Sequence, residues 1–140
     1  MESIHDLVKI KDLEKSVNRV SDFIKDEVSN RFQKFGVVVG LSGGIDSAVT
    51  AALCAKSLGP EKVLGLIMPE KESDSTSQTH AEKVAQKYNI KTKIVDITSI
   101  LDSFGVYQNK ERIIKEKFSD FNNNCKYRVA VPSKLSSSIG

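Results

Sequence analysis

The sequence predicts an α/β protein, a doubly wound parallel sheet with helices on both faces, preceded by a long amphipathic helix. Three observations support this fold class. Short, continuous apolar runs of the kind found in buried parallel strands alternate with helical patterns. The links between these segments are short, as in βαβ units. A glycine-rich turn joins the first strand to the helix that follows it.

The first element is a long helix over about residues 9–33. Apolar side chains recur there at spacings of three or four, while charged residues occupy the other positions. The apolar stripe consists of Ile10, Leu13, Val17, Val20, Ile24, Val28 and Phe32. We expect this helix to lie against the outside of the domain or against a partner.

The next segments alternate between strands and helices. A β-branched run, Val37–Leu41, lies between glycines and predicts a buried central strand. A helix of small residues follows from about Asp46 to Leu58, where Gly59 and Pro60 end it. Val63–Met68 predicts a second buried strand.

A polar, serine-rich stretch, Glu70–Thr79, predicts a loop that leads into a helix with Ala81, Val84, Ala85 and Tyr88 on one face. Its serines follow the carboxyl end of the second strand, where ligands of doubly wound sheets bind. A mobile loop and a lid that closes over substrate are both compatible with this composition. Residues 91–97 alternate like a third strand.

The pattern is looser after Thr98. Ile100, Leu101 and Phe104 suggest a short helix that Gly105 ends, and residues 110–118 a second helix capped by Asn109. Residues 127–131 resemble a strand. We therefore expect residues 1–140 to form a single domain with its core at 9–98, and 99–140 to be a less typical extension or insertion.

The composition is that of an ordinary soluble globular domain, with 39% hydrophobic and 28% charged residues. The net charge of +3 is mild and its basic residues are scattered, which argues against a nucleic-acid partner. Cys54 and Cys125 stand alone, so they predict neither a zinc site nor a disulfide framework. With no signal-peptide pattern and no apolar run near the roughly 18 residues of a membrane span, we expect a cytoplasmic protein without a membrane partner.

The turn Ser42–Ser47 has the sequence Ser-Gly-Gly-Ile-Asp-Ser and predicts a phosphate site. A turn from a buried strand into a helix offers unpaired backbone N–H groups to an anion. Gly43 and Gly44 let a phosphate approach the backbone closely, and Ser42 and Ser47 add hydroxyl donors. The predicted ATP-binding residues are Gly40, Leu41, Ser42, Gly43, Gly44, Ile45, Asp46 and Ser47.

Asp46 is unexpected in such a turn, because a carboxylate repels phosphates unless a cation lies between them. We therefore predict that Asp46 binds Mg²⁺, which would bridge to the nucleotide. Two other phosphate-binding patterns are absent: no GxxxxGK[ST] sequence occurs, and the glycines do not have GxGxxG spacing. We assign no catalytic side chain, since positioning and charge neutralisation suffice for this chemistry.

The turn resembles the SGGxDS signature of the ATP-pyrophosphatase, or PP-loop, superfamily. The resemblance implies an adenine nucleotide alpha-hydrolase-like fold whose loop grips the β,γ-pyrophosphate. It also implies that a substrate oxygen attacks the α-phosphate, that ATP is split to AMP and pyrophosphate, and that a nitrogen or sulfur nucleophile displaces AMP.

Within that superfamily the chain resembles the ammonia-dependent NAD synthetases. The resemblance lies in the N-terminal helix, residues 38–49, Leu66–Pro69 and Ile94–Ile97. It implies that ATP, deamido-NAD and ammonia are substrates, that the nicotinate carboxylate is adenylated and then amidated, and that the complete enzyme is a homodimer. Two alternatives remain open, a PP-loop amide ligase for another carboxylate and a nucleotide-binding module without catalysis.

The later elements of that family are not found after Thr98. They are an Arg-rich basic helix, a Gly-Thr-Gly-Asn loop and a second acidic metal ligand. We therefore expect this chain to be the N-terminal part of a longer enzyme.

Overall fold

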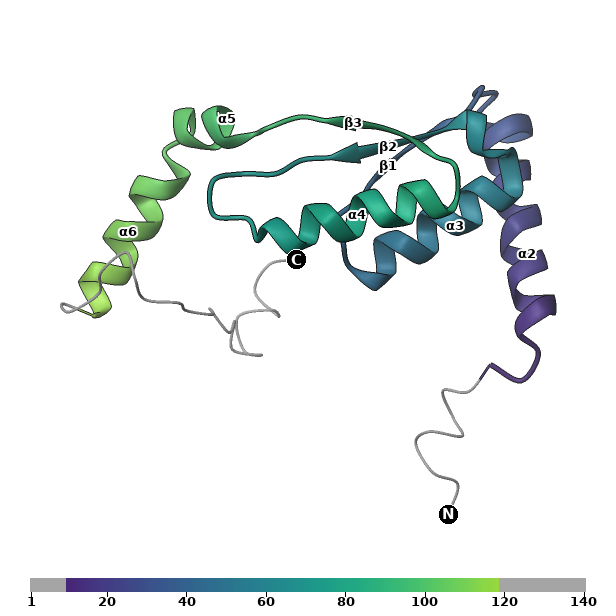
Figure 1. The fold of residues 1–140 in the computed structure, drawn as a ribbon, viewed down its shortest axis with the longest axis horizontal. Helices are drawn as coiled ribbons and strands as arrows, with labels where there is room; N and C mark the ends of the chain where they lie inside the picture. The colour runs from purple at the N-terminus through teal and green to yellow at the C-terminus, as the bar shows by residue number, and fades with distance from the viewer. Residues whose placement is uncertain (1–9, 119–140) are drawn as a thin grey trace, which may run out of the picture. The chain divides into compact units, whose positions relative to one another are not determined.

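The computed structural model describes residues 10–118 and divides the chain into two units, one ending at Ser99 and one beginning at Ile100. The first unit contains a parallel sheet of three strands in the order β1-β2-β3 (Figure 1). These strands are β1 (Val37–Gly40), β2 (Val63–Ile67) and β3 (Lys91–Ile94). The predicted α/β fold with a parallel sheet is confirmed.

The predicted N-terminal helix is present but starts later than expected. Asp12 accepts a hydrogen bond from the Lys15 amide and caps α2 (Leu13–Lys25), so the helix begins at Leu13. Its last part is the wider π-helix η1 (Asp26–Arg31), in which the Phe32 amide bonds back to the Glu27 carbonyl. The apolar stripe is only partly buried: Ile24 packs against the core, whereas Leu13, Val20 and Phe32 stay exposed.

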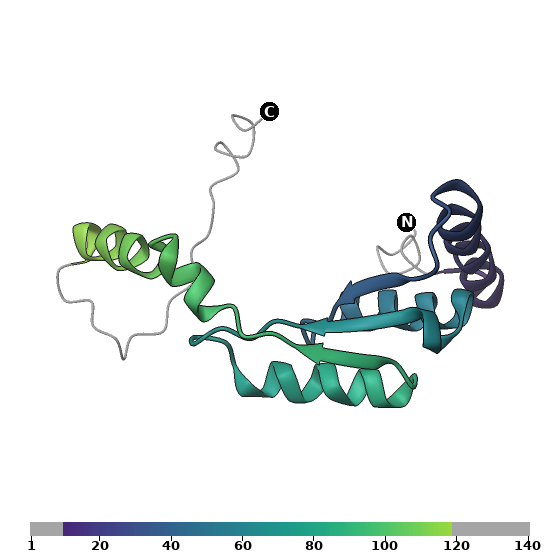
Figure 2. The ribbon, with the colours of Figure 1, turned by 90° about the horizontal axis from the view of Figure 1, so that it is seen from above.

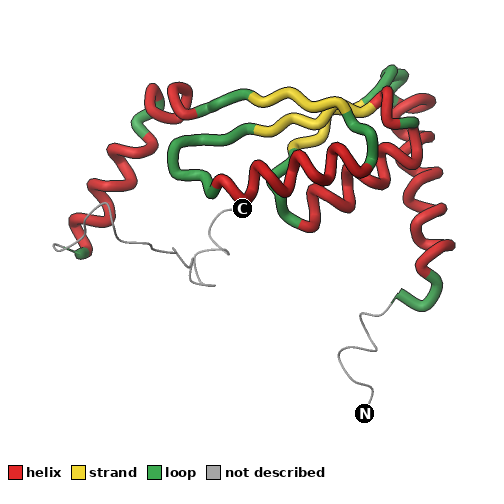
Figure 3. The backbone as a smooth tube through the Cα atoms, viewed as in Figure 1, coloured by secondary structure: helices red, strands yellow, loops and turns green. Residues whose placement is uncertain are grey.

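Two helices connect the three strands. They are α3 (Ile45–Leu58), which leads to β2 through the short η2 (Pro60–Lys62), and α4 (Ser75–Lys87). Helix α4 starts within the stretch predicted to be a loop, because the Asp74 carboxylate caps it by accepting from the Thr76 amide. In Figure 3 both helices run beside the strands, as expected for βαβ crossovers.

One hydrophobic core joins the strands to α3 and α4. Small side chains of the helices (Ala51, Cys54, Ala55, Ala81 and Ala85) pack on Val39, Val63 and Ile67 of the sheet. Both helices therefore cover the same face, below the sheet in Figure 1. The described residues of the first unit, 10–99, contain no helix on the opposite face, so the helix predicted there stays a prediction.

The second unit contains most of α5 (Thr98–Ser103) and all of α6 (Val106–Lys117). Helix α6 begins directly after Gly105, whose φ is +68°, so the predicted start at residue 110 with Asn109 as the cap was wrong, and Asn109 lies inside the helix. The strand predicted at 127–131 lies outside the described residues. Within residues 10–118, no helix combines the length and the apolar composition that a bilayer crossing requires.

Candidate functional site

The candidate site is the turn between β1 and α3, at the carboxyl edge of the sheet. Gly40 is the last residue of β1 and Ile45 the first of α3, so Leu41–Gly44 make the whole connection. Leu41 is buried in the core and its amide donates to the Leu66 carbonyl of β2 at 2.9 Å. This bond and the burial of Leu41 fix the entry to the turn, so the turn has a rigid base.

Among residues 10–118, no side chain caps the amino terminus of α3. The N-cap residue is Gly44, in extended backbone, and no described side chain accepts from the first turn. In contrast, Asp12 caps α2 and Asp74 caps α4. The first-turn amides of α3 are therefore left without a protein acceptor at the positive end of the helix dipole, and both features favour a bound anion.

The two glycines of the turn have different structural roles. Gly43 has a φ of +79°, and a Cβ there would lie 2.3 Å from the carbonyl oxygen of Ser77 in α4. Gly44 has an ordinary φ of −84°, and a Cβ would meet only the Ser42 hydroxyl at 3.3 Å. Glycine is thus required at position 43 by the positive φ and by the nearby Ser77 carbonyl oxygen, whereas glycine at position 44 keeps the approach to the amino terminus of α3 open.

The hydroxyl groups of Ser42 and Ser47 brace the turn through hydrogen bonds to each other and to the backbone of the turn. The Ser47 hydroxyl donates to the Gly44 carbonyl at 2.9 Å and accepts from the Ser42 amide at 3.2 Å. The two hydroxyl oxygens are 3.1 Å apart, and the Ser42 hydroxyl accepts from the Gly44 amide at 3.3 Å. Because the single proton of Ser47 is donated to the Gly44 carbonyl, the Ser42 hydroxyl is the donor in its bond to Ser47, and it would have to leave that bond to donate to a phosphate.

Asp46 lies exposed in the first turn of α3, with no partner for its carboxylate within residues 10–118. Over the same residues, no group of three or more His, Cys, Asp or Glu side chains could hold a metal ion. Asp46 can therefore supply one oxygen ligand to a hard cation, and the remaining ligands would have to be phosphate oxygens, water or other polypeptide. Such a sparse protein contribution suits Mg²⁺, which keeps several waters.

A cleft of about 400 Å³ lies beside the turn. Its lining comes from the turn and from the segments after β2: Leu41, Ser42, Ile67, Met68, Pro69, Glu70, Ser73, Asp74, Ser75, Ser77 and Gln78. Its size is that of a small-molecule site. The serines noted in the sequence after β2 are thus brought next to the turn. Sequence analysis did not predict the backbone contact of Gly43 with Ser77, which no residue pattern signals.

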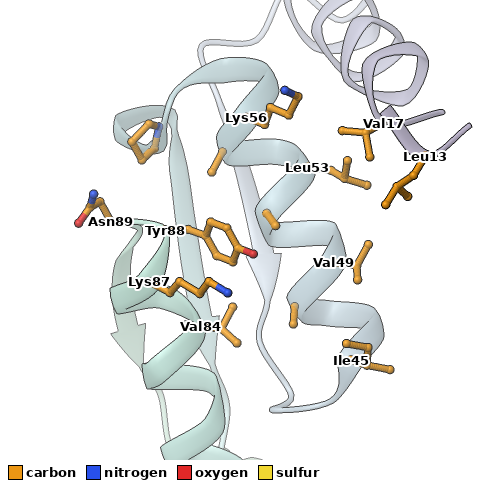
Figure 4. Close-up of a pocket in the computed structure, with 14 residues that line it drawn as sticks. Leu13, Val17, Ile45, Val49, Leu53, Lys56, Val84, Lys87, Tyr88 and Asn89 are labelled. Carbon is orange, nitrogen blue, oxygen red and sulfur yellow. The ribbon is translucent and has the colours of Figure 1, made fainter. Parts of the chain in front are cut away.

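A second, apolar groove of about 830 Å³ lies between α2, α3 and α4 (Figure 4). Ile45 is the only predicted ATP-binding residue that lines it, together with Leu13, Val49 and Tyr88. The Ile45 side chain thus belongs to this groove, and only its backbone amide can serve the anion site. The groove lining is mostly apolar, which does not suit a polyphosphate.

Two titratable groups outside the turn have shifted pKa values. Burial raises the pKa of the Cys54 thiol, which lies in the core against the sheet. Hydrogen bonds from the side chain and the amide of Thr98 lower the pKa of Asp96, whose carboxylate accepts from that amide at 2.8 Å. Asp96 thereby starts α5, which accounts for this residue without a ligand.

Comparison with known proteins gives one consistent family. A family model described as NAD synthase matches residues 16–139. The chain is 45% identical over 119 residues to the NH(3)-dependent NAD(+) synthetase of Methanocaldococcus jannaschii, covering 85% of this chain and 46% of that protein. The chain thus spans about half the length, or less, of the curated relatives it matches.

Solved structures agree with this match. The NH3-dependent NAD synthetase from Campylobacter jejuni, determined in complex with nitrate, has a TM-score of 0.62 and 41% identity, covering 69% of this chain and 41% of that one. The NMN synthetase from Francisella tularensis also has a TM-score of 0.62, with 27% identity, covering 69% of this chain and 40% of that one.

Proposed function

The chain belongs to the NAD synthase family, and from that premise we propose that it is the ATP-binding part of an ammonia-dependent NAD synthetase. The substrates would be ATP, deamido-NAD and ammonia. The observation that carries the proposal is the braced turn Ser42–Ser47 in front of the uncapped helix α3. Its free amides fit the β,γ-pyrophosphate of ATP, the Ser42 hydroxyl can add a donor by leaving its bond to Ser47, and the adjacent cleft fits the nucleoside.

The proposed reaction has two displacements. A carboxylate oxygen of the nicotinate group attacks the α-phosphorus of ATP, and the bond to the β,γ-pyrophosphate breaks. Ammonia then attacks the carboxyl carbon of the acyl adenylate, AMP leaves with the electron pair of the broken C–O bond, and the nitrogen releases one proton to water to give the amide. The protein supplies the positioned amides of α3, which stabilise the charge on the departing pyrophosphate.

Mg²⁺ is part of the proposal, with Asp46 as its ligand from this chain. When bound, the ion would supply neutralising charge to the polyphosphate. Asp46 fits this role because its exposed carboxylate has no partner within residues 10–118 and lies in the same helical turn as the free amides. We assign catalysis to no other side chain of this chain.

The functional test is a product assay on a polypeptide that spans the full length of the relatives. With ATP, ammonium and a panel of carboxylates, we expect AMP and pyrophosphate in equal amounts, and amide product only with deamido-NAD. ADP and phosphate as products would overturn the superfamily assignment. AMP formation with another carboxylate would support the proposed splitting of ATP at the Ser42–Ser47 turn and would favour an amide ligase with a different substrate. The panel should include a mononucleotide acceptor, since one structural neighbour is an NMN synthetase. Nucleotide binding without turnover in any mixture would favour a module that only binds.

We also propose that the complete enzyme is a homodimer whose contact includes the apolar groove of α2, α3 and α4. The groove is lined by exposed apolar side chains, among them Leu13, Ile45 and Val49, which a second copy would bury. Sedimentation at micromolar concentration should give a dimer mass, and Val49→Lys should shift it toward the monomer. Lys83→Glu, on α4 but outside the groove lining, is the matched control. A fully active monomer would contradict this proposal.

The proposal includes a cytoplasmic location and no nucleic-acid or membrane partner. Cys54 is a free, buried thiol, which is ordinary in a reducing compartment. The scattered charge seen in the sequence gives no basic patch for nucleic acid.

A further inference from the structure

The backbone of the Ser42–Ser47 turn does not fix its own conformation, because it contains two successive glycines. Glycine adopts positive and negative φ about equally well, and Gly43 has a φ of +79°. Apart from its neighbours in the chain, the three heavy atoms nearest to a Cβ built on Gly43 all belong to the backbone of Ser77. The first turn of α4 therefore limits the conformations that Gly43 can adopt.

The first turn of α4 lies outside the core. The buried side chains of this helix are Ala81 and Ala85, which are 1% and 3% exposed, so the core anchors α4 from Ala81 onward. Residues 74–76, which precede Ser77, are exposed. In Figure 2, α4 runs alongside the strands, and its amino-terminal end lies at the end of the sheet to which the strand arrows point. An exposed helix end of this kind frays readily unless a cap holds it.

Asp74 provides the cap of α4. Its carboxylate accepts a hydrogen bond from the Thr76 amide at 2.9 Å, and its carbonyl accepts one from the Ser77 amide at 3.0 Å. Its backbone is extended, as is typical of an N-cap, with a φ of −70° and a ψ of 125°. Asp74 thus orders the same helical turn whose Ser77 backbone lies against Gly43.

We propose that Asp74 is a positioning residue for ATP. By capping α4 it keeps the Ser77 backbone against Gly43, and this contact keeps the turn in the conformation that receives phosphate. This role rests on the proposed function, in which the turn binds ATP. Ser42 and Ser77 both line the adjacent cleft, so fraying of the first turn of α4 would also displace part of the cleft lining. Asp74 lines the same cleft, so its negative charge has to be separated from its cap.

Three variants of an enzyme that spans the full length of the relatives separate the cap from the charge. Asp74→Ala removes both. Asp74→Asn removes the charge and keeps the cap, because asparagine and aspartate are equally good N-caps. Asp12→Ala removes the matching cap from α2, which contributes no residue to the lining of the cleft. The two alanine variants should lose similar, small amounts of thermal stability, so they differ mainly in which helix is uncapped.

Calorimetric titration with ATP and the ATP dependence of AMP formation give the first readout. An N-cap changes the equilibrium between the ordered and the frayed first turn about fivefold. Because the apparent Kd rises as the competent fraction falls, Asp74→Ala should raise both the Kd and the KM for ATP about twofold to fivefold. It should leave kcat unchanged, because saturating ATP selects the ordered turn. Asp74→Asn and Asp12→Ala should leave both constants within about 1.5-fold of the wild type.

Amide hydrogen exchange without nucleotide gives a second readout, which does not depend on ATP binding. The Gly44 amide donates to the Ser42 hydroxyl, and the Ala48 amide donates to the Gly44 carbonyl. Both amides should exchange about twofold to fivefold faster in Asp74→Ala and at the wild-type rate in the other two variants. A wild type that binds no ATP but shows this exchange pattern would refute the proposed function while supporting the positioning of the turn by Asp74.

Three outcomes would overturn the role of Asp74. Equal losses of ATP affinity in Asp74→Ala and Asp74→Asn would assign the effect to the charge rather than to the cap. Unchanged exchange of the Gly44 and Ala48 amides in Asp74→Ala would mean that the turn keeps its conformation without the cap of α4. An equal effect of Asp12→Ala on ATP affinity would mean that any small loss of stability weakens binding.

Discussion

Gly43 and Gly44 are neighbours in the sequence, and the structure predicts opposite consequences for replacing each by alanine. At Gly43, the φ of +79° costs an L-residue about 1 kcal/mol or more. The new Cβ would also lie 2.3 Å from the Ser77 carbonyl oxygen, well inside contact distance, and forcing that backbone apart costs about 1–3 kcal/mol. The sum, roughly 2–4 kcal/mol, is a large part of the stability of a typical domain.

At Gly44 neither penalty applies. Its backbone is extended, and a Cβ would meet only the end of the Ser42 side chain at 3.3 Å, which can rotate away. The remaining cost is that alanine is a poorer N-cap than glycine, on the order of 0.5–1 kcal/mol. A methyl group there does, however, narrow the approach to the α3 amides. Gly44→Ala should therefore reduce ATP affinity while leaving the fold nearly intact.

Thermal unfolding followed by circular dichroism separates the two effects. For a domain of this size, about 3 °C is lost per kcal/mol, so Gly43→Ala should lower the midpoint by roughly 6–12 °C and Gly44→Ala by no more than about 3 °C. Gly43→Asn tests the cause, because asparagine tolerates positive φ but still carries a Cβ. It should recover about 1 kcal/mol and no more. If Gly43→Ala and Gly44→Ala melt together, the contact with Ser77 does not constrain the turn and the reasoning fails.

Three further predictions concern single side chains. Asp46→Asn should leave the fold intact and reduce Mg²⁺-dependent AMP formation by the full-length enzyme about a hundredfold, which is the scale of losing one well-placed electrostatic group. Unchanged AMP formation would refute the assignment of Asp46 as a metal ligand. Ser47→Ala removes the hydroxyl that joins the Ser42 amide to the Gly44 carbonyl, so it should lower the free energy of unfolding by on the order of 1 kcal/mol. It should also weaken ATP binding, measured by calorimetry. An unchanged ATP affinity would mean that these hydrogen bonds are not needed for binding. Burial raises the pKa of Cys54, so the neutral thiol stabilises the native state at pH values below the unfolded pKa, and this contribution is lost as pH rises above it. In a Cys125→Ser background, iodoacetamide at pH 8 should modify Cys54 only as fast as the chain unfolds, and rapid labelling under native conditions would contradict its place in the core.

The sequence by itself determined the order of the elements and the place of the phosphate turn. Strands β1 and β2 were predicted to within one residue, because unbroken β-branched and apolar runs between glycines or prolines have few other stable conformations. The signature Ser42–Ser47 was equally informative, since its glycines and serines suit a strand-to-helix turn. Helix starts were predicted less well. Asp12 and Asp74 are common residue types, and only the folded backbone shows that each accepts from an amide two or three residues on.

Only the tertiary structure showed that neighbouring residues of the turn have different structural roles. Gly43 and Gly44 are identical in sequence terms, and their difference arises because the Ser77 carbonyl of α4, a distant segment of the chain, lies against one of them. Ser42 and Ser47 likewise differ through the hydrogen bonds of the folded turn, in which Ser47 donates to the Gly44 carbonyl and Ser42 donates to the Ser47 hydroxyl. Ile45 faces the apolar groove because α2 and α4 pack beside α3. Contacts between distant segments depend on how helices and strands pack, and a local residue pattern does not predict that packing.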